Sequence, residues 1–238
     1  MQLRHLLLCF PLWISCQNTP ATPITLEKVT LEPASLRFTK PSQRSYSQEK
    51  KVVKDLKNAL NAAFSNEETS RVFTAIMVHH LIPYWVGTPW SFDGHPEQPG
   101  TQPVACSYFV ATVLRDAGVT LNRYRMAQLG PEDEARYLSE KDPYLTLTFS
   151  DADSGKKMLA EKIPEGIHFI GFGDIHVGFI YRKGNQMTFI HSYYKNTIGV
   201  IIDPIENSPL WEVCNRFYVY PLSGNAPFLT RWKTKKAA

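Results

Sequence analysis

Residues 104–118 of this 238-residue chain read Val104-Ala105-Cys106-Ser107-Tyr108-Phe109-Val110-Ala111-Thr112-Val113-Leu114-Arg115-Asp116-Ala117-Gly118. Phe109, Val110, Val113 and Leu114 recur at the spacing of one apolar helical stripe. Gly118 then supplies the residue that most easily adopts the left-handed conformation ending a helix, and Pro103 disfavours an earlier start. We therefore predict a buried helix that begins at or next to Cys106.

Cys106 is the residue of this stretch that can carry chemistry. In the first turn of a helix, unpaired backbone N–H groups and the positive end of the helix dipole favour a thiolate, which is the nucleophilic form of cysteine. The alternative is that Cys106 is a small apolar core residue, a common role for a buried cysteine. The rest of the chain has to decide between these two interpretations.

The composition is that of an ordinary globular protein, with 43% hydrophobic and 20% charged residues, and the length suits one domain with extensions. The formal net charge is only +4, and no basic run interleaved with aromatics indicates nucleic acid, so we exclude that partner. Cys9, Cys16, Cys106 and Cys214 are scattered, which fits neither a disulfide framework nor a zinc site. We expect no metal and no cofactor.

The first 15 residues have the features of a secretory signal peptide, because a short basic start precedes an apolar run too brief to span a bilayer. The end of this segment resembles a bacterial lipoprotein signal, in which a small residue precedes the lipidated cysteine. Here Ser15 precedes Cys16, with Trp13 where leucine is usual. We predict an exported lipoprotein anchored to the membrane through Cys16, with ordinary signal cleavage as the alternative. Residues 16–47 are expected to form a tether and an extended lead-in.

Two helices are expected to follow the tether, over residues 52–63 and 66–83. The second begins with a capping-box pattern, in which Ser65 and Glu68 satisfy each other's backbone donors. The aromatic segment that comes next, residues 84–90, leads through a polar loop directly to Cys106. Its aromatic side chains either line a groove for a substrate or fill the edge of the core.

A second chemical feature lies in residues 173–181. The apolar positions 175, 177, 179 and 181 share one face of a predicted strand, whereas His176 and Gly178 lie on the other face. Because glycine has no side chain, Gly178 leaves room for another group to approach the His176 imidazole. The strand therefore presents a histidine with open space beside it.

A hairpin turn near residues 183–185 leads into a second predicted strand over residues 187–192. A two-residue turn at Gly184-Asn185 would place Gly178 opposite His191, and one at Lys183-Gly184 would place His176 opposite His191. In both registers the two histidines share a face, with Cβ atoms ~4.5–8 Å apart. A hydrogen bond between their rings is therefore feasible.

Cysteine, histidine and a third polar group form a complete nucleophilic constellation, in which the third group fixes the tautomer of the imidazole. Papain-like folds carry the cysteine on a helix that packs against a sheet bearing the histidine. We accordingly predict an α+β, papain-like domain over residues 48–228, with Cys106, His176 and His191 as catalytic residues. Residues 229–238 are expected to be a solvated basic tail.

Three other segments have simpler interpretations. Residues 131–164 are expected to form a loop or small helix that rims the cleft. Their run Asp151-Ala152-Asp153-Ser154-Gly155 lacks the closing ligands of a calcium loop. A strand is expected over residues 217–220, and Cys214 is expected to be a buried packing residue.

The order of these motifs resembles the NlpC-type cell-wall cysteine peptidases, which are papain-like enzymes. The corresponding segments, in order, are residues 84–88, residues 105–110, Arg125-Met126-Ala127-Gln128, His176-Val177-Gly178 and His191. The sequence departs from the family pattern where Ala105 replaces an aspartate, Tyr108 replaces a glycine, Trp85 lies one place early and Thr88 replaces a glycine.

The resemblance implies a monomeric peptidase or amidase that cuts amide bonds in peptidoglycan stem peptides through a thioester on Cys106. It implies that Tyr84 lies near the nucleophile, and it makes Tyr84, Trp85 and Tyr108 candidate substrate-binding residues. Two alternatives stay open: a papain-like acyltransferase or amidase with a substrate outside the wall, and a non-catalytic wall-binding lipoprotein.

Overall fold

The computed structural model describes residues 38, 43–195 and 198–234, and its fold is α+β, as predicted. The strands are β1 Leu145–Thr148, β2 Gly166–Phe172, β3 His176–Lys183, β4 Gln186–Tyr193, β5 Gly199–Pro204 and β6 Arg216–Pro221. They form one sheet in the order β1-β6-β2-β3-β4-β5, in which every neighbouring pair is antiparallel. The α-helices are α1 Tyr46–Ala59, α2 Asn66–Ala75, α3 Ile82–Trp85, α4 Cys106–Asp116, α5 Arg123–Ala127, α6 Pro131–Ser139, α7 Ala152–Lys162 and α8 Ala226–Thr234.

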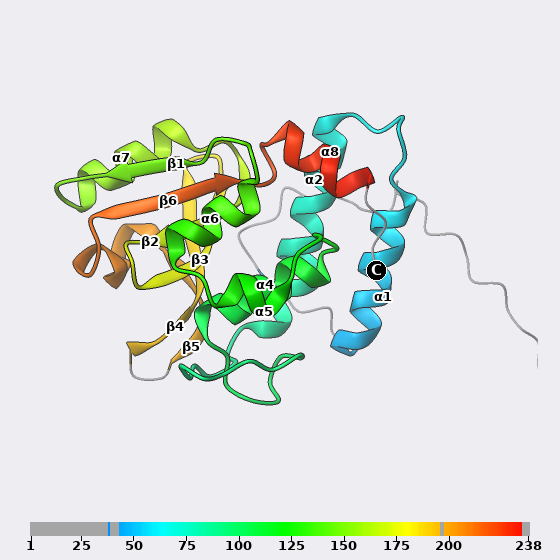
Figure 1. Ribbon diagram of the computed structural model, residues 1–238, viewed down its shortest axis with the longest axis horizontal. Helices are drawn as coiled ribbons and strands as arrows, with labels where there is room; N and C mark the ends of the chain where they lie inside the picture. The colour runs from blue at the N-terminus through cyan, green and yellow to red at the C-terminus, as the bar shows by residue number, and fades with distance from the viewer. Residues whose placement is uncertain (1–37, 39–42, 196–197, 235–238) are drawn as a thin grey trace, which may run out of the picture.

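Helix α4 lies between the sheet and the outer helices (Figure 1). It packs against β3 and β4, while α2 packs against α8 on the side of the molecule away from the sheet. A π-helical segment, Ile76–Leu81, joins α2 to α3, and short 3-10 helices at Ile205–Asn207 and Pro209–Glu212 follow β5. Helix α4 is therefore buried on several sides, and Cys106 in its first turn contacts the backbone of Val177 at the start of β3.

The two faces of the sheet bury separate hydrophobic cores. Val177 and Phe179 of β3 belong to the core shared with α4, whereas Ile180 belongs to the core on the opposite face. This is the alternation expected of a strand with both faces covered. The predicted division between two faces is confirmed for residues within β3, whereas Ile175 precedes the strand and is exposed.

The β3–β4 hairpin has the first of the two registers considered. Lys183 pairs with Gln186, so the turn is Gly184-Asn185, and Gly184 adopts a positive φ of 57°. A Cβ placed on Gly178 would lie 2.8 Å from the Cβ of His191, so the space beside His176 is occupied by the second histidine. Only glycine at position 178 permits this close approach.

The predicted helix boundaries are confirmed at both ends of α4 and at the start of α2. Helix α4 begins at Cys106 and is followed by Gly118 at φ 82°. Ser65 caps α2 and forms the reciprocal capping box with Glu68. Local chemistry therefore determined where these helices start and stop.

Two segments have more structure than we expected. Residues 131–164, predicted as a loop or small helix, form α6, β1 and α7, and Asp151 serves as the N-cap of α7. Residues 229–234, assigned to a solvated tail, belong to α8, where Leu229 and Trp232 are buried in the core. Helix α8 forms because apolar residues recur at helical spacing within this basic segment, so that one face is buried while the charges stay in solvent.

The N-terminal predictions fall largely outside the described residues. These include the signal peptide over residues 1–15, Cys16 and most of the tether, although α1 already begins at Tyr46. Among the helices that the structure describes, none combines the length and the apolar character required to cross a bilayer.

Candidate active site

Cys106 is positioned by backbone contacts of the residues that precede it. The Ala105 N–H donates to the Gly94 carbonyl oxygen over 2.8 Å, and the Val104 N–H donates to the Pro89 carbonyl oxygen over 2.8 Å. Both acceptors belong to the loop that joins α3 to α4. The first turn of α4 is therefore pinned to this loop, and Cys106 is half-buried beneath it.

Burial dominates the ionisation of the Cys106 thiol. Desolvation raises the pKa of the thiol above its ordinary value. The Val177 N–H and the Ser107 hydroxyl lower the pKa, but by less. The net direction is opposite to that expected from the helix N-terminus alone, so the thiol is the resting form at neutral pH.

His176 and His191 form the buried pair that the register predicted. His176 Nε2 lies 2.8 Å from His191 Nδ1, and the two residues are 1% and 0% exposed. Desolvation lowers the pKa of both imidazoles, so both rings are neutral at pH 7 and one of them donates to the other. Because Nε2 of His176 is engaged, its Nδ1 is the nitrogen left for a group in the neighbouring pocket.

Cys106 and His176 line one pocket of about 820 Å³. The pocket walls come from the start of α4, the segment before β3, the loop after α3, and the segment between α5 and α6. The lining residues include Trp90, Phe92, Asp93, His95, Cys106, Tyr108, Asp174, His176 and Tyr194. In the described part of the chain, no hydrogen bond joins the Cys106 thiol to either imidazole. Cys106 and His176 therefore share the lining of one pocket, without a hydrogen bond between the thiol and the imidazole in the described structure.

The three candidate substrate-binding residues have different positions. Tyr108 lines the pocket. Tyr84 is 9% exposed, and its hydroxyl donates to the Arg44 carbonyl oxygen over 2.8 Å, on the side of α1. The Trp85 ring is buried against Phe109, and its Nε1 donates to Tyr46. Of the three, the structure brings only Tyr108 to the pocket.

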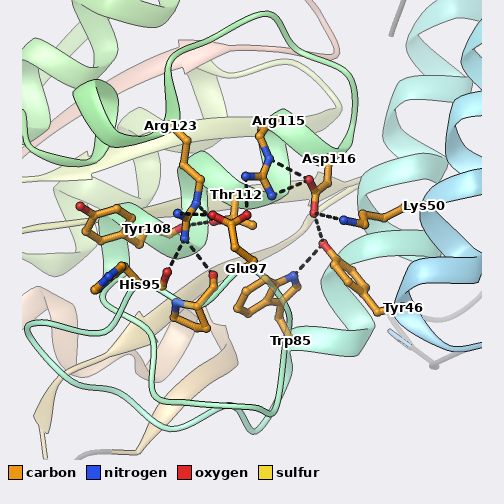
Figure 2. A network of polar contacts seen from close by, with 11 residues as sticks. Tyr46, Lys50, Trp85, His95, Glu97, Tyr108, Thr112, Arg115, Asp116 and Arg123 are labelled. Carbon is orange, nitrogen blue, oxygen red and sulfur yellow. Dashed lines mark hydrogen bonds and ion pairs between the residues drawn. The ribbon is translucent and has the colours of Figure 1, made fainter. Parts of the chain in front are cut away.

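The loop wall of the pocket is held by a buried arginine (Figure 2). Arg123 forms an ion pair with Glu97 at 2.9 Å and donates to the carbonyl oxygens of His95 and Pro96 at 2.8 Å each. Its guanidinium also lies over the Tyr108 ring, 5.0 Å from the centroid. A single cation therefore fixes both the loop and the aromatic side chain beside the nucleophile.

A buried carboxyl group lies behind the nucleophile. Glu134 of α6 is 0% exposed, and burial raises its pKa to about 8. The Ser107 hydroxyl lowers the pKa by a smaller amount, although neither carboxyl oxygen has a hydrogen bond of standard geometry. Glu134 is therefore a neutral acid at pH 7, and it adds no charge to the site.

The sequence reasoning missed several residues that line or adjoin this pocket. His95 and Trp90 line the pocket, and the buried Trp90 Nε1 has no hydrogen-bond partner in the described structure. Asp203 of β5 lies 3.8 Å from His191 Nε2. The aromatic content of residues 84–90 was a signal for Trp90, but Asp203 carried none because its strand was not predicted.

Neither Cys214 nor the acidic run at residues 151–155 belongs to the pocket. Cys214, expected to be a buried packing residue, is partly buried and packs against the core that contains Ile180, and its thiol donates to the Leu210 carbonyl oxygen. Within the described residues, no group of three or more His, Cys, Asp or Glu side chains is arranged to hold a metal ion. The N-cap role of Asp151 accounts for the acidic run that contains it.

The described structure is an α+β fold in which a buried helix that starts with a cysteine packs against an antiparallel sheet that carries two paired histidines. Comparison of the chain with protein-family models, with curated proteins and with solved structures gave no match.

Proposed function

We propose that this protein is an exported cysteine hydrolase that cleaves amide bonds through a thioester on Cys106, with the stem peptides of peptidoglycan as its substrate. The observation that carries the proposal is the shared pocket of Cys106 and His176, with His176 hydrogen-bonded to His191 at 2.8 Å. The choice of substrate and the lipid anchor at Cys16 rest on the sequence motifs.

The reaction would proceed in two stages. As Cys106 attacks the amide carbon, its thiol proton passes to His176 Nδ1, and the protonated imidazole gives that proton to the departing amine as the C–N bond breaks. His176 then takes a proton from water, the hydroxide attacks the thioester, and the proton returns to the Cys106 sulfur as the acid is released. Unpaired N–H groups at the start of α4 would stabilise the oxyanion in both stages.

The raised pKa of Cys106 is compatible with this cycle. A thiol that stays protonated in the free enzyme can lose its proton to His176 as its sulfur bonds to the amide carbon, because the acidity of the thiol rises as that bond forms. The neutral state of His176 also favours the reaction, because a protonated imidazole could not accept that proton.

The test uses purified peptidoglycan and the full chain. We expect the wild type to release stem-peptide fragments, detected by mass spectrometry, and Cys106→Ala to release none. Cys214→Ala is the matched control, because it removes the other described free thiol and should leave release unchanged. Equal release by the wild type and Cys106→Ala would refute the proposal.

One observation favours the alternative of an acyltransferase or amidase with a substrate outside the wall. Trp90, Phe92, Tyr108 and Tyr194 give the pocket aromatic walls, and the charged side chains among its described lining residues are Asp93 and Asp174. Such a site suits an apolar acyl group better than the carboxylates of a stem peptide. A Cys106-dependent acyl-enzyme formed from an apolar ester or thioester, without wall cleavage, would favour this second function.

A further inference from the structure

Asp203 occupies a position relative to His191 that follows from the β4–β5 register. His191 pairs with Ile201, and Asp203 lies two residues further along β5, hence on the same face of the sheet. Its side chain is 13% exposed, and its Oδ2 lies 3.8 Å from His191 Nε2. The carboxylate therefore adjoins the end of the histidine pair that is remote from the pocket.

His191 Nε2 is a buried ring nitrogen without a hydrogen-bond partner in the described structure. Its other nitrogen is engaged by His176, so Nε2 is the only atom of the ring that can respond to a third group. The 3.8 Å gap is too long for a hydrogen bond, but a movement of about 1 Å would close it. Buried polar groups rarely stay unpaired in a protein interior.

We propose that Asp203 is a positioning residue that sets the tautomers of both histidines, so that His176 presents an unprotonated Nδ1 to the Cys106 thiol. A carboxylate can only accept a hydrogen bond, so it selects the form of His191 that carries its proton on Nε2. His191 Nδ1 is then an acceptor and takes a hydrogen bond from His176 Nε2–H. Nδ1 of His176 is left as the basic nitrogen.

If the hydrogen bond between the two rings ran in the opposite direction, from His191 to His176, the site would lack its base. If His191 carried its proton on Nδ1, it would donate to His176 Nε2, and the neutral His176 would hold its proton on Nδ1. That nitrogen is the one not engaged by His191, and once protonated it could not accept a proton from the thiol. The 2.8 Å contact between the rings is compatible with both directions, so an outside group has to choose between them.

Asp203 is itself oriented by a neighbour. The Ser208 hydroxyl donates a hydrogen bond to Asp203 Oδ2, the same oxygen that lies nearest His191 Nε2. Interaction with Asp203 also raises the pKa of His191, against the larger lowering by burial. The titratable groups that face His191 are His176 on β3, Tyr193 on β4 and Asp203 on β5. Tyr194 adjoins His176, and the charge of Glu212 acts on Tyr193.

This inference rests on the proposed function, but its first test does not need a substrate. Nitrogen-15 NMR of the imidazoles in the full chain reports directly which ring nitrogen carries the proton. We expect Nε2–H on both His176 and His191 in the wild type at pH 7. Protonation of His191 at Nδ1 in the wild type would overturn the proposal, whatever the variants do.

Variants at position 203 supply the second test. In Asp203→Asn the side-chain amide can donate to His191 Nε2, so we expect a population with the reversed tautomers and a loss of kcat of about 10²-fold with KM little changed. Asp203→Glu restores the carboxylate and should restore most of the activity. Asp153→Asn, which alters a fully solvated aspartate on α7, is the matched control.

The outcomes separate this inference from the proposed function. If Cys106→Ala remains active, the proposed function fails and the tautomer measurement still stands. If Cys106 is required but Asp203→Asn matches Asp153→Asn in kcat and in its imidazole spectrum, the role of Asp203 is refuted. Should Asp203→Asn not fold, the wild-type spectrum and Asp203→Glu still decide the question.

Discussion

The Ser192 hydroxyl donates a hydrogen bond to the Val104 carbonyl oxygen across 2.7 Å, in a buried contact between residues 88 positions apart. Ser192 follows His191 on β4, and Val104 lies two residues before Cys106. The contact therefore ties the segment before α4 to the strand that carries His191.

Replacing Ser192 with alanine should loosen this connection. The variant leaves a buried carbonyl oxygen without its donor, and we expect the free energy of unfolding to fall by roughly 1–3 kcal/mol. Urea denaturation measures the change, and Ser47→Ala, at an exposed position of α1, is the control. If the two variants are equally stable, the contact contributes nothing to the fold.

Glu134 should make stability depend on pH in a direction unusual for a carboxylate. Its pKa is raised from 4.5 to about 8 in the folded state, so the folded chain holds a proton that the unfolded chain has lost between these values. The contribution of this group to the free energy of unfolding is therefore largest below pH 4.5. It declines as the pH rises and is smaller by a few kcal/mol at pH 8.

Glu134→Gln should remove this dependence, because glutamine is neutral at every pH. Thermal unfolding at pH 5 and pH 8 should therefore show that the melting temperature of Glu134→Gln rises relative to that of the wild type as the pH increases. A wild type that is equally stable relative to Glu134→Gln at both values would show that the carboxyl is not buried in its neutral form.

The two described free thiols should alkylate slowly and at different rates. Burial raises the pKa of Cys106, and it raises the pKa of Cys214 to about 11, so little thiolate exists at pH 7. We expect iodoacetamide to label both more slowly than a small free thiol, with the Cys106 rate increasing into the alkaline range. Mass spectrometry of the two peptides follows each site, and a rate plateau for Cys106 below pH 7 would instead reveal an ion pair with His176.

Arg123 should be essential to the order of the pocket loop. Lysine has one charged nitrogen and cannot reproduce the contacts to Glu97, His95 and Pro96 together, so Arg123→Lys should cost roughly 2–4 kcal/mol of stability. Hydrogen exchange at the Val104 and Ala105 amides, which bond to this loop, should accelerate.

The control for the arginine variant is Arg71→Lys. Arg71 forms an exposed ion pair with Glu67 within α2, where lysine serves nearly as well and the pair contributes little. Unchanged exchange at residues 104 and 105 in Arg123→Lys would mean that other contacts hold the loop.

The parts of the fold that could be predicted are those with local causes. The start of α4 at Cys106, the Ser65 cap and a hairpin turn near residues 183–185 each follow from a few adjacent residues, whereas the structure selected Gly184-Asn185 from the two possible turns. Residues 131–164 were harder, because α6 packs on β2 and β6, β1 pairs with β6 and α7 packs on β1, and none of these elements has a strong local pattern. Tyr84 and Trp85 were assigned to the substrate side by their place in the chain, whereas α3 turns them towards α1.

By itself, the sequence determined the periodicities, the helix ends and two possible hairpin registers, both of which place His176 and His191 on one face. Those features depend on backbone geometry over a few residues. Only the tertiary structure decided that Asp203 adjoins His191, that Arg123 holds the loop, and that the pKa of Cys106 is raised. These depend on contacts between distant segments and on the loss of water around a group, which no short stretch of sequence specifies.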